Sequence, residues 1–345
     1  MEWVAAFKEF VRRQAEKNVL IRDLLIRRRE RIFRSGQGAV VTTEPFGILN
    51  VELTNKCPMR CVMCARTKNM TRAQGFMGFS VFQSIVDQYV AVNPVAARTK
   101  DFWLHHFGES LMHPEFGKCI RYAVSRDVKA ALSINPIMLS PAVSKDLLTS
   151  GIRTLYVSLD GHDDESFAKI RGVDNAFEKS KENLFAFLKL KEDLRAPVRV
   201  SLSMIDFKEN RASIDKMGRF WRSVRGVDEF RCKVFTTWNG DAPDVISFSD
   251  VKGDQGQLSK LYRVVGCLNP WQQMSVAWDG DVIPCCYDYD KKYVLGNVNE
   301  HSLAEIWNGE RMQQLRREFL SNKVGNRLCR DCDGLYPPLF HKDMM

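Results

Sequence analysis

The sequence predicts an α/β fold with parallel strands, followed by a smaller second domain. Between residues 47 and 237, short apolar runs typical of strands alternate with stretches of helical periodicity. Such alternation favours parallel strands joined by right-handed crossovers. Near residue 238 the alternation gives way to a turn-rich stretch, and a cysteine-containing segment follows it. A chain of 345 residues is long enough for both domains.

The composition is that of an ordinary globular protein. Hydrophobic residues make up 45% of the chain and charged residues 27%, and no apolar run approaches the ~18–20 residues of a membrane span. Glu2, Lys8 and Glu9 interrupt the region that would have to be apolar in a signal peptide. Ten cysteines without an export signal favour metal or redox use over a disulfide framework. We therefore expect a cytoplasmic protein with no membrane partner.

Residues 1–46 are predicted to form a helical extension. Apolar residues recur at helical spacing over residues 2–33, and Ser35-Gly36-Gln37-Gly38 ends the helix. The net charge is +9, and residues 1–35 contribute +5 of it through ten Lys/Arg and five Asp/Glu. A basic surface suits nucleic acid, anionic lipid or an acidic partner, but a solvated helix face explains it more simply. We expect the apolar stripe to pack on the main domain and no nucleic-acid partner.

Six predicted strands follow one another along the main domain. Helical stretches near residues 79–92, 114–125, 141–149, 163–190 and 210–222 separate them. The predicted strands are Gly47–Thr54, Asp101–Phe107, Lys129–Ile134, Arg153–Leu159, Val198–Ile205 and Glu229–Phe235.

Three cysteines follow the first predicted strand directly. Cys57, Cys61 and Cys64 share one short loop with the spacing C-x3-C-x2-C. Thiolates suit iron–sulfur clusters, and three of them hold three corners of a four-iron cubane, so one iron has no protein ligand. An open iron is a place where a small molecule can be bound and activated. A zinc site, the alternative, closes with four ligands, and the next Cys or His residues are the distant Cys119 and His105.

This loop resembles the signature of the radical S-adenosylmethionine (SAM) enzymes. In that family SAM binds the open iron and is cleaved by one electron to methionine and a 5′-deoxyadenosyl radical, which abstracts a hydrogen atom from substrate. The resemblance implies a partial (β/α)6 TIM-like barrel over residues 47–237, with its chemistry at the C-terminal ends of the strands. It also implies a reductant such as flavodoxin or ferredoxin. Met63 stands where the family usually has an aromatic residue near the adenine, so we expect its backbone to serve and its side chain to pack.

Polar residues at the predicted strand ends are candidates for SAM contacts. Gly108-Glu109-Ser110 resembles the family's Gly-Gly-Glu segment, which binds the SAM amino group, with Phe107 in place of the first glycine. For the other strand-end residues a simple cap is the alternative, and Arg171 either meets the SAM carboxylate or caps a helix. By the resemblance, the cofactor-binding residues are Met63, Gly108, Glu109, Ser133, Asn135, Ser158, Asp160 and Arg171.

Residues 238–345 are predicted to form a linker and an auxiliary-cluster domain. The pattern Cys267-x12-Gly280-x4-Cys285, followed by Cys329-x2-Cys332, supplies four cysteines, enough to close one [4Fe–4S] cluster. Residues 278–286 favour a hairpin that brings two of these ligands together. The pattern resembles the domain called SPASM in its full form and twitch in its short form. A structural zinc ribbon is the alternative, although it usually has two close C-x2-C pairs.

Three further cysteines are left over. Cys119 lies in a helical apolar pattern and is expected in the core. Cys232 lies on the last predicted strand and Cys286 adjoins a cluster ligand, so either can face the substrate or be an idle thiol.

The whole layout resembles the radical SAM dehydrogenases and epimerases of aminoglycoside biosynthesis. It implies that a carbinol carbon of a sugar, aminocyclitol or similar small molecule is oxidised or epimerised. Oxidation would use the second cluster as electron acceptor, and epimerisation would use the thiol of Cys286 or Cys232 as catalytic hydrogen donor. Modification of a ribosomally made peptide is the alternative, although the segment before Gly47 is short for the recognition domain common in those enzymes. A cluster or zinc protein that binds nucleic acid leaves Gly108-Glu109 unexplained.

Overall fold

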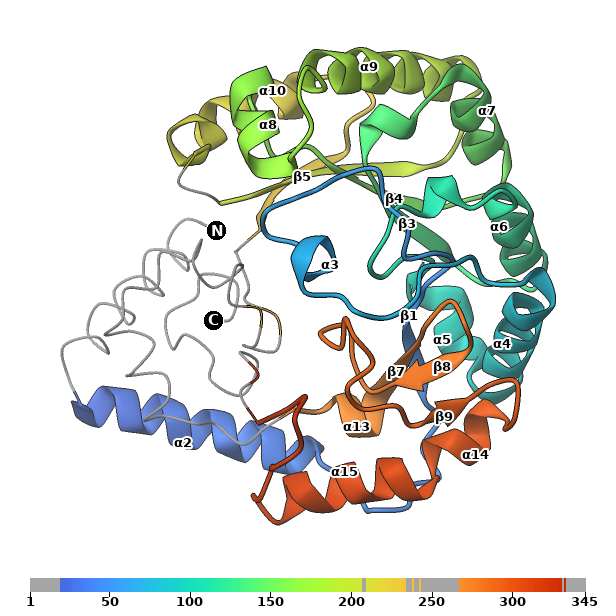
Figure 1. Ribbon diagram of the computed structural model, residues 1–345, viewed down its shortest axis with the longest axis vertical. Coiled ribbons are helices and arrows are strands. Elements are labelled where there is room, and N and C mark those ends of the chain that lie inside the picture. The colour runs from blue at the N-terminus through green and yellow to red at the C-terminus, as the bar shows by residue number, and fades with distance from the viewer. Residues whose placement is uncertain are drawn as a thin grey trace.

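A curved sheet with helices along its outer side forms the body of the molecule, as the computed structural model shows (Figure 1). The structure describes residues 19–206, 209–233, 238, 242, 267–330 and 332. The predicted linker, apart from Trp238 and Ala242, and the first half of the predicted N-terminal helix therefore lie outside the described residues. Within them, nine strands form one sheet in the order β6-β5-β4-β3-β2-β1-β7-β8-β9. The first six run parallel in sequence order, which confirms the predicted α/β partial barrel.

The six barrel strands lie within the predicted ranges and are shorter at their ends. Each is flanked in the sheet by its neighbours in the chain, because right-handed crossovers place successive strands side by side. The strands are β1 (Gly47–Val51), β2 (Phe102–Trp103), β3 (Ala130–Ile134), β4 (Thr154–Ser158), β5 (Arg199–Ile205) and β6 (Glu229–Lys233).

The connecting helices follow the predicted pattern closely. Ser140 caps α7 by accepting from the Val143 amide, and Asp163 and Ser166 form a reciprocal capping box on α8. The helices of the barrel are α3 (Ala65–Lys68), α4 (Phe79–Val92), α5 (Pro94–Thr99), α6 (Phe116–Ser125), α7 (Pro141–Thr149), α8 (Asp164–Arg171), α9 (Phe177–Asp193) and α10 (Ile214–Ser223), with short 3-10 turns η1 (Ser110–Met112), η2 (Pro136–Met138) and η3 (Arg211–Ser213).

Alternation along the strands separates an outer face, packed against helices, from an inner face. Leu155, Val157 and Leu202 are fully buried in the hydrophobic core, as is Cys119 of α6, which confirms the core position expected for that cysteine. Ser133, Tyr156 and Ser158 alternate with these residues and are only partly buried. We call the face that carries them the inner face.

The C-terminal region extends the same sheet. β7 (Gln273–Val276) pairs in parallel with β1, and β8 (Asp281–Ile283) returns antiparallel to β7, which confirms the predicted hairpin. The Phe46 and Trp307 rings lie 5.8 Å apart, and residues of both regions belong to one hydrophobic core. The second region is thus fused to the barrel edge. Its remaining elements are α13 (Asn269–Gln272), β9 (Gly296–Asn297), α14 (Leu303–Trp307) and α15 (Glu310–Leu320).

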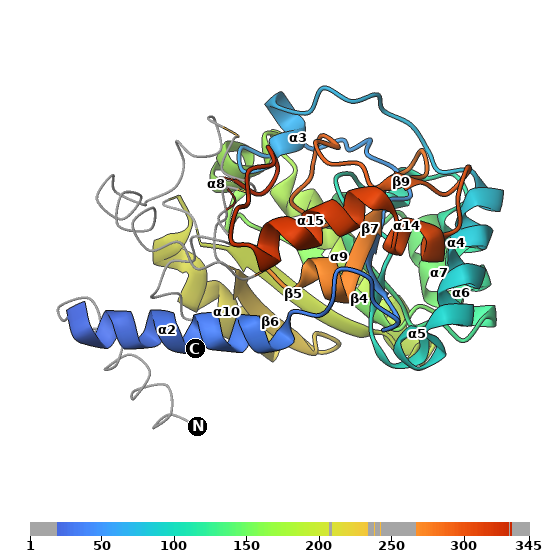
Figure 2. The ribbon, with the colours of Figure 1, turned by 90° about the horizontal axis from the view of Figure 1, so that it is seen from below.

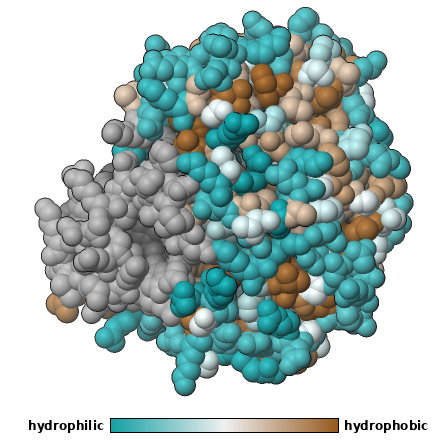
Figure 3. All heavy atoms as spheres, viewed as in Figure 1, coloured by the Kyte–Doolittle hydropathy of each residue, from teal (hydrophilic) through white to brown (hydrophobic). Residues whose placement is uncertain are grey.

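The N-terminal helix differs from its prediction. Helix α2 (Val19–Gly36) lies along one edge of the molecule in both ribbon views (Figures 1 and 2). Its apolar residues Leu20, Leu24 and Ile32 are 74%, 66% and 56% exposed. The expectation that this stripe packs on the main domain is therefore wrong for the residues described. No helix in the described part of the chain is both long and apolar enough to cross a membrane. The face seen in Figure 3 is mainly hydrophilic, with hydrophobic residues scattered over it.

Candidate active site

The cysteine loop after β1 is fastened to the end of α8 by backbone hydrogen bonds. The Arg60 amide donates to the Arg171 carbonyl and the Val62 amide to the Ile170 carbonyl, each at 3.0 Å. Gly172 ends α8 with a left-handed φ of +69°, and a Cβ there would lie 2.4 Å from the Arg60 carbonyl oxygen. Only glycine combines that backbone conformation with so close an approach. The segment Ile170–Gly172 therefore positions the loop.

Arg171 also provides the positive charge at this loop. Its guanidinium is nearly buried, donates to the Cys61 thiol at 3.5 Å and pairs with Asp160 at 2.5 Å. The other Asp160 oxygen accepts from the Ile205 amide at 2.6 Å. Asp160 thus holds Arg171 in place. Two roles were open for Arg171: contact with the SAM carboxylate, or capping of a helix. Its guanidinium lies against Cys61, and its backbone forms the last residue of α8.

The three thiols of the loop suit an iron–sulfur cluster. Burial raises the pKa of Cys57 to about 12 and that of Cys64 to about 11, and the Coulombic influence of Cys61 adds to both shifts. Such thiols bind as thiolates only where a cation compensates their charge, as iron does. Among the described residues, no group of three or more His, Cys, Asp or Glu side chains is placed to hold a single metal ion. A cubane binds each cysteine through a different iron, so it requires no such convergence.

Glu109 is a buried carboxylate held by backbone amides. Its Oε1 accepts from the Leu111 amide at 3.1 Å and its Oε2 from the Asn135 amide at 2.7 Å, and the side chain belongs to a residue only 3% exposed. Burial raises its pKa to about 7. Among the described residues no Lys or Arg forms an ion pair with it. A fixed carboxylate of this kind is a ready acceptor for a cationic ligand.

Gly108 has a structural role that the sequence did not reveal. A Cβ at this position would lie 2.2 Å from the Thr54 carbonyl oxygen and 2.8 Å from the Asn55 Cα. The adjacent Glu109 amide donates to the Lys56 carbonyl at 2.8 Å. The segment after β2 therefore lies directly against the start of the cysteine loop. Glycine is needed here because any side chain would separate the two.

Asn135 lies beside Glu109 at the end of β3, and two candidate serines stand on β3 and β4. The Asn135 Oδ1 accepts from the Ile137 amide at 3.0 Å, while its buried Nδ2 has no hydrogen-bond partner among the described residues. Ser133 and Ser158 stand on the inner face and are partly buried. A buried amide donor beside an open carboxylate fits a ligand that carries both an acceptor and an ammonium group.

Met63 packs as expected. Its side chain is 7% exposed within the core, and its carbonyl oxygen accepts from the Trp238 indole Nε1 at 3.0 Å. Trp238 also packs against Phe107, with ring centroids 4.9 Å apart. Phe107, which stands where the family segment has a glycine, thus contacts this tryptophan.

The four auxiliary cysteines come together. The pKa of Cys285 is raised by burial and further by the charges of Cys286 and of the three other assigned ligands, Cys329, Cys332 and Cys267. Cys267 and Cys329 likewise have raised pKa values, through burial first and then through the other thiols. The hairpin β7–β8 brings Cys285 to this group from a distant part of the sequence. The donor set is therefore four partly buried thiols from three segments, which fits a fully ligated cluster.

Sequence reasoning missed a buried network centred on Glu52 at the end of β1. Both Glu52 oxygens accept from the Arg72 guanidinium, at 2.6 and 2.7 Å, and the Phe107 and Trp278 amides donate to them at 3.1 and 3.3 Å. His106 lies 3.6 Å from Glu52 through its Nδ1, and its Nε2 is 2.8 Å from the Cys286 carbonyl oxygen. This network joins the strand before the cysteine loop to the auxiliary hairpin. A charged residue inside an apolar strand run was the only signal for it.

The two candidate hydrogen donors differ in position. On β6, Arg231 contacts the Tyr156 hydroxyl of the inner face, whereas Cys232 alternates to the outer face with Phe230. The expectation that Cys232 faces the substrate is therefore wrong. Cys286 is partly buried next to Cys285 and stays a prediction.

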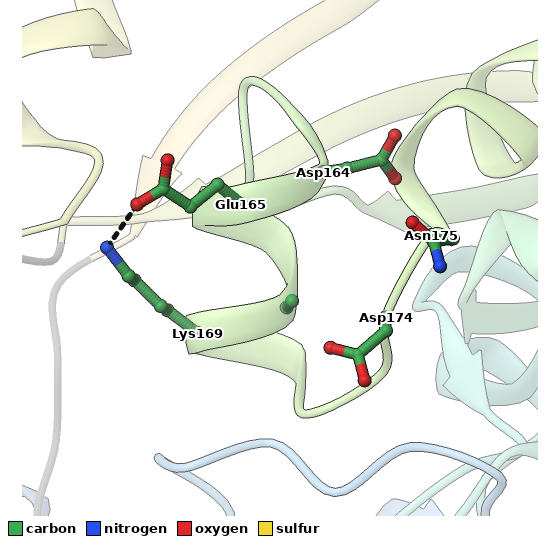
Figure 4. A pocket seen from close by; sticks show the side chains of 6 residues that line it. Asp164, Glu165, Lys169, Asp174 and Asn175 are labelled. Carbon is green, nitrogen blue, oxygen red and sulfur yellow. Dashed lines mark hydrogen bonds and ion pairs between the residues drawn. The ribbon is translucent and has the colours of Figure 1, made fainter.

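A shallow surface hollow lies elsewhere, on α8 and the loop after it (Figure 4). Its residues include Asp164, Asp174 and Asn175, and a Glu165–Lys169 ion pair lines one side. None of the predicted site residues lines it.

Comparison with protein families supports the two-part organisation. Residues 51–220 match the radical SAM superfamily, and residues 267–333 match SPASM, an iron–sulfur cluster-binding domain. The chain belongs to the radical SAM superfamily. Iron–sulfur clusters and SAM are accordingly its cofactors. The matched segments lie inside the predicted domains 47–237 and 238–345, whose boundaries stay predictions.

Two curated relatives span most of the chain. A tungsten-containing aldehyde ferredoxin oxidoreductase cofactor-modifying protein of Pyrococcus furiosus is 22% identical over 82% of this chain and 86% of its own length. An AdoMet-dependent heme synthase of Methanosarcina barkeri is 24% identical over 81% of this chain and 89% of its own. Similarity to a 2-deoxy-scyllo-inosamine dehydrogenase of Niallia circulans, 28% identical, covers only 21% of this chain.

Solved structures share the fold. Streptococcus suis SuiB bound to its precursor peptide SuiA superimposes with a TM-score of 0.62 at 13% identity, covering 90% of this chain and 74% of SuiB. BtrN in complex with AdoMet and 2-DOIA gives 0.52 at 15% identity, covering 84% of this chain and 93% of BtrN. At these identities the similarity shows the fold alone.

Proposed function

We propose that this radical SAM protein oxidises a carbinol carbon of a sugar, aminocyclitol or similar small molecule. Cys57, Cys61 and Cys64 hold the cluster that binds SAM, and Cys267, Cys285, Cys329 and Cys332 hold an auxiliary [4Fe–4S] cluster. When bound, SAM supplies the 5′-deoxyadenosyl radical that abstracts a hydrogen atom from substrate. A flavodoxin or ferredoxin is the reductant.

The observation that carries the proposal is the open carboxylate beside the cysteine loop. Glu109 is fixed by two amides and is close to Cys57, yet no cationic side chain among the described residues pairs with it. It accepts the ammonium of SAM. The Asn135 Nδ2 and Arg171 offer donors for the SAM carboxylate, and Ser133 and Ser158 face the ribose. Asp160 acts through Arg171, and the Met63 backbone lies near the adenine.

Oxidation is favoured over epimerisation by the position of the thiols. Epimerisation needs a hydrogen donor on the substrate face opposite the adenosyl group, and Cys232 lies on the outer face of the sheet. Oxidation needs an electron acceptor, and the four thiols at the barrel edge are suited to hold a cluster that serves as one. Of the two candidate thiols, Cys286 then remains as the hydrogen donor that epimerisation would require.

Cluster content is the first test. Anaerobically reconstituted protein should contain about eight irons per chain, and the variant with Cys57, Cys61 and Cys64 all changed to Ala should retain about four and form no 5′-deoxyadenosine from SAM. The matched control is Cys119→Ala, which removes a core thiol and should keep all the iron. Zinc in place of iron, or a single cluster in the wild type, contradicts the assignment.

Turnover in deuterated water separates oxidation from epimerisation. Oxidation yields a product lighter than substrate by two hydrogen atoms, with the same outcome in Cys286→Ala. Solvent deuterium on the product carbon, lost in Cys286→Ala, would instead establish epimerisation with that thiol as donor. Mass spectrometry of the product distinguishes the two.

A second candidate function is modification of a ribosomally made peptide. It is favoured by similarity to a PqqA peptide cyclase of Granulibacter bethesdensis, 22% identical over 84% of this chain and 80% of its own length. Incubating peptide and polyol candidates separately with SAM and reductant, and following 5′-deoxyadenosine, discriminates the two readings.

A further inference from the structure

A cluster of four side chains occupies the inner face of the sheet. Trp103 ends β2, His105 follows it, Tyr156 comes from β4 and Lys233 ends β6. The Trp103 ring lies edge-on to the rings of Tyr156, at 4.7 Å, and His105, at 5.3 Å. The Lys233 Nζ lies 5.4 Å from the Tyr156 ring centroid, and its charge reaches His105. Three strands and the segment after β2 thus bring these four residues together.

His105 presents a neutral N–H donor to this place. The Ser133 amide donates to its Nδ1 at 3.2 Å, so Nδ1 is the acceptor nitrogen. Burial, and next the nearby Lys233, lowers the pKa of His105 to about 3, which keeps the ring neutral. The remaining hydrogen is therefore on Nε2.

Lys233 lacks a counter-charge among the described residues. Its neighbour Arg231 is paired with Glu229 at 2.6 Å, and Asp160 is already paired with Arg171 at 2.5 Å. No carboxylate in the described part of the chain forms an ion pair with Lys233 itself, and burial lowers its pKa. A partly buried ammonium with a neutral donor opposite is a site that an anion completes.

We propose that Lys233 and the Nε2–H of His105 bind a carboxylate group of the substrate, with Trp103 and Tyr156 as the apolar wall beside it. The substrate is then an acid, such as a sugar acid, rather than a neutral polyol. A carboxylate accepts two hydrogen bonds at once, so these donors fix its orientation as well as its position. The reacting carbon is thereby held toward the strand ends, where the Glu109 site lies. This inference rests on the proposed function for placing the substrate on the inner face.

The test is the rate at which an amine-acylating reagent labels Lys233 in the reconstituted wild-type protein, followed by peptide mass spectrometry. Acetate and its neutral isostere acetamide are compared at equal concentration, with ionic strength held constant by chloride. Bound acetate stabilises the ammonium and raises the pKa of Lys233, so the reactive free amine becomes scarcer. The charged and titratable groups that face this amine are Tyr156, His105, Arg231, Asp160 and Arg171.

Acetate should slow labelling of Lys233 by roughly threefold or more relative to acetamide, which corresponds to a rise of about half a pKa unit. Lys189, an exposed lysine paired with Asp193, is the internal control and should label equally in both. The His105→Phe variant, which keeps a ring but removes the donor, should reduce the acetate effect. Equal labelling of Lys233 in acetate and acetamide, or no labelling in either, overturns the proposal. Labelling does not require SAM cleavage, so an acetate effect in a protein that makes no 5′-deoxyadenosine contradicts the proposed function alone.

Discussion

Two buried glutamates stand at the ends of neighbouring strands and serve opposite purposes. Glu52, after β1, has all its hydrogen-bond partners within the protein. The Arg72 guanidinium donates to both of its oxygens, and two backbone amides also donate to them. Glu109, after β2, accepts from two backbone amides and from no cationic side chain among the described residues. The same side chain is thus closed at one site and left open for a ligand at the other.

The difference in partners assigns a structural role to Glu52 and a ligand-binding role to Glu109. The Glu52 partners come from the segment after the cysteine loop, from the segment after β2 and from the auxiliary hairpin, so this carboxylate connects three regions. The Glu109 partners are the backbone amides of Leu111 and Asn135, which fix the carboxylate without neutralising it. Breaking a complete buried ion pair is costly, whereas a buried charge that has no partner in the protein can bind a counter-ion supplied by a ligand. Neutralising each glutamate should therefore change a different measurable property.

The largest effect is expected for Glu52→Gln. This change leaves the Arg72 guanidinium buried without its counter-charge, since the Arg72 side chain is only 5% exposed. The free energy of unfolding should fall by about 3–5 kcal/mol. Denaturant unfolding followed by circular dichroism measures it.

The control is the double variant Glu52→Gln/Arg72→Met, which removes both charges. It should be clearly more stable than Glu52→Gln alone, because no uncompensated charge remains. If the single and double variants were equally stable, the ion pair would not be the source of the coupling.

A smaller effect, on ligand binding, is expected for Glu109→Gln. The SAM ammonium loses its charge-assisted acceptor, so binding should weaken by roughly 1.5–3 kcal/mol. Isothermal titration of the reconstituted protein with SAM measures this loss. Glu115→Gln is the matched control, because Glu115 is an exposed residue of the same segment paired with Lys118. Wild-type affinity in Glu109→Gln would remove this carboxylate from the SAM site.

The comparison also shows what the sequence was able to predict. Glu109 was found because it directly follows a predicted strand and matches a segment with a known role. Glu52 was missed because its partners Arg72 and Trp278 lie about 20 and more than 200 residues away in the chain, and only the fold brings them together. For the same reason the parallel pairing of β7 with β1 had no sequence signal. Gly108 was identified, but its close approach to Thr54 is visible only in three dimensions.

Periodicity was informative where one side of an element is buried and misleading where it is not. The ranges of the barrel strands and the bounds of α7 followed from periodic patterns in the sequence. The apolar stripe of α2 has the same periodicity, yet its described residues are exposed. Cys232 shows a second limit of sequence-based prediction. A shift of one position along a strand changes the face on which a side chain lies, so the face of Cys232 was not predictable from its strand alone.

The smallest effects are expected from changes to two tryptophans, one near the proposed SAM site and one near Glu52. The Trp238 indole donates to the Met63 carbonyl beside the cysteine loop at 3.0 Å, and the Trp278 indole donates to the Ala73 carbonyl at 3.2 Å, next to the Glu52 network. Changing either to Phe keeps an aromatic ring and removes one hydrogen bond, worth about 1 kcal/mol. Trp238→Phe should weaken SAM binding by about that amount, because the Met63 backbone lies at the proposed adenine site. Trp278→Phe should lower the free energy of unfolding by a similar amount and leave SAM affinity unchanged, because its hydrogen bond lies next to the Glu52 network and away from the proposed SAM site. Paired titration and unfolding experiments on the two variants measure both quantities, and an equal loss of SAM affinity in both would show that the two glutamate sites are not independent.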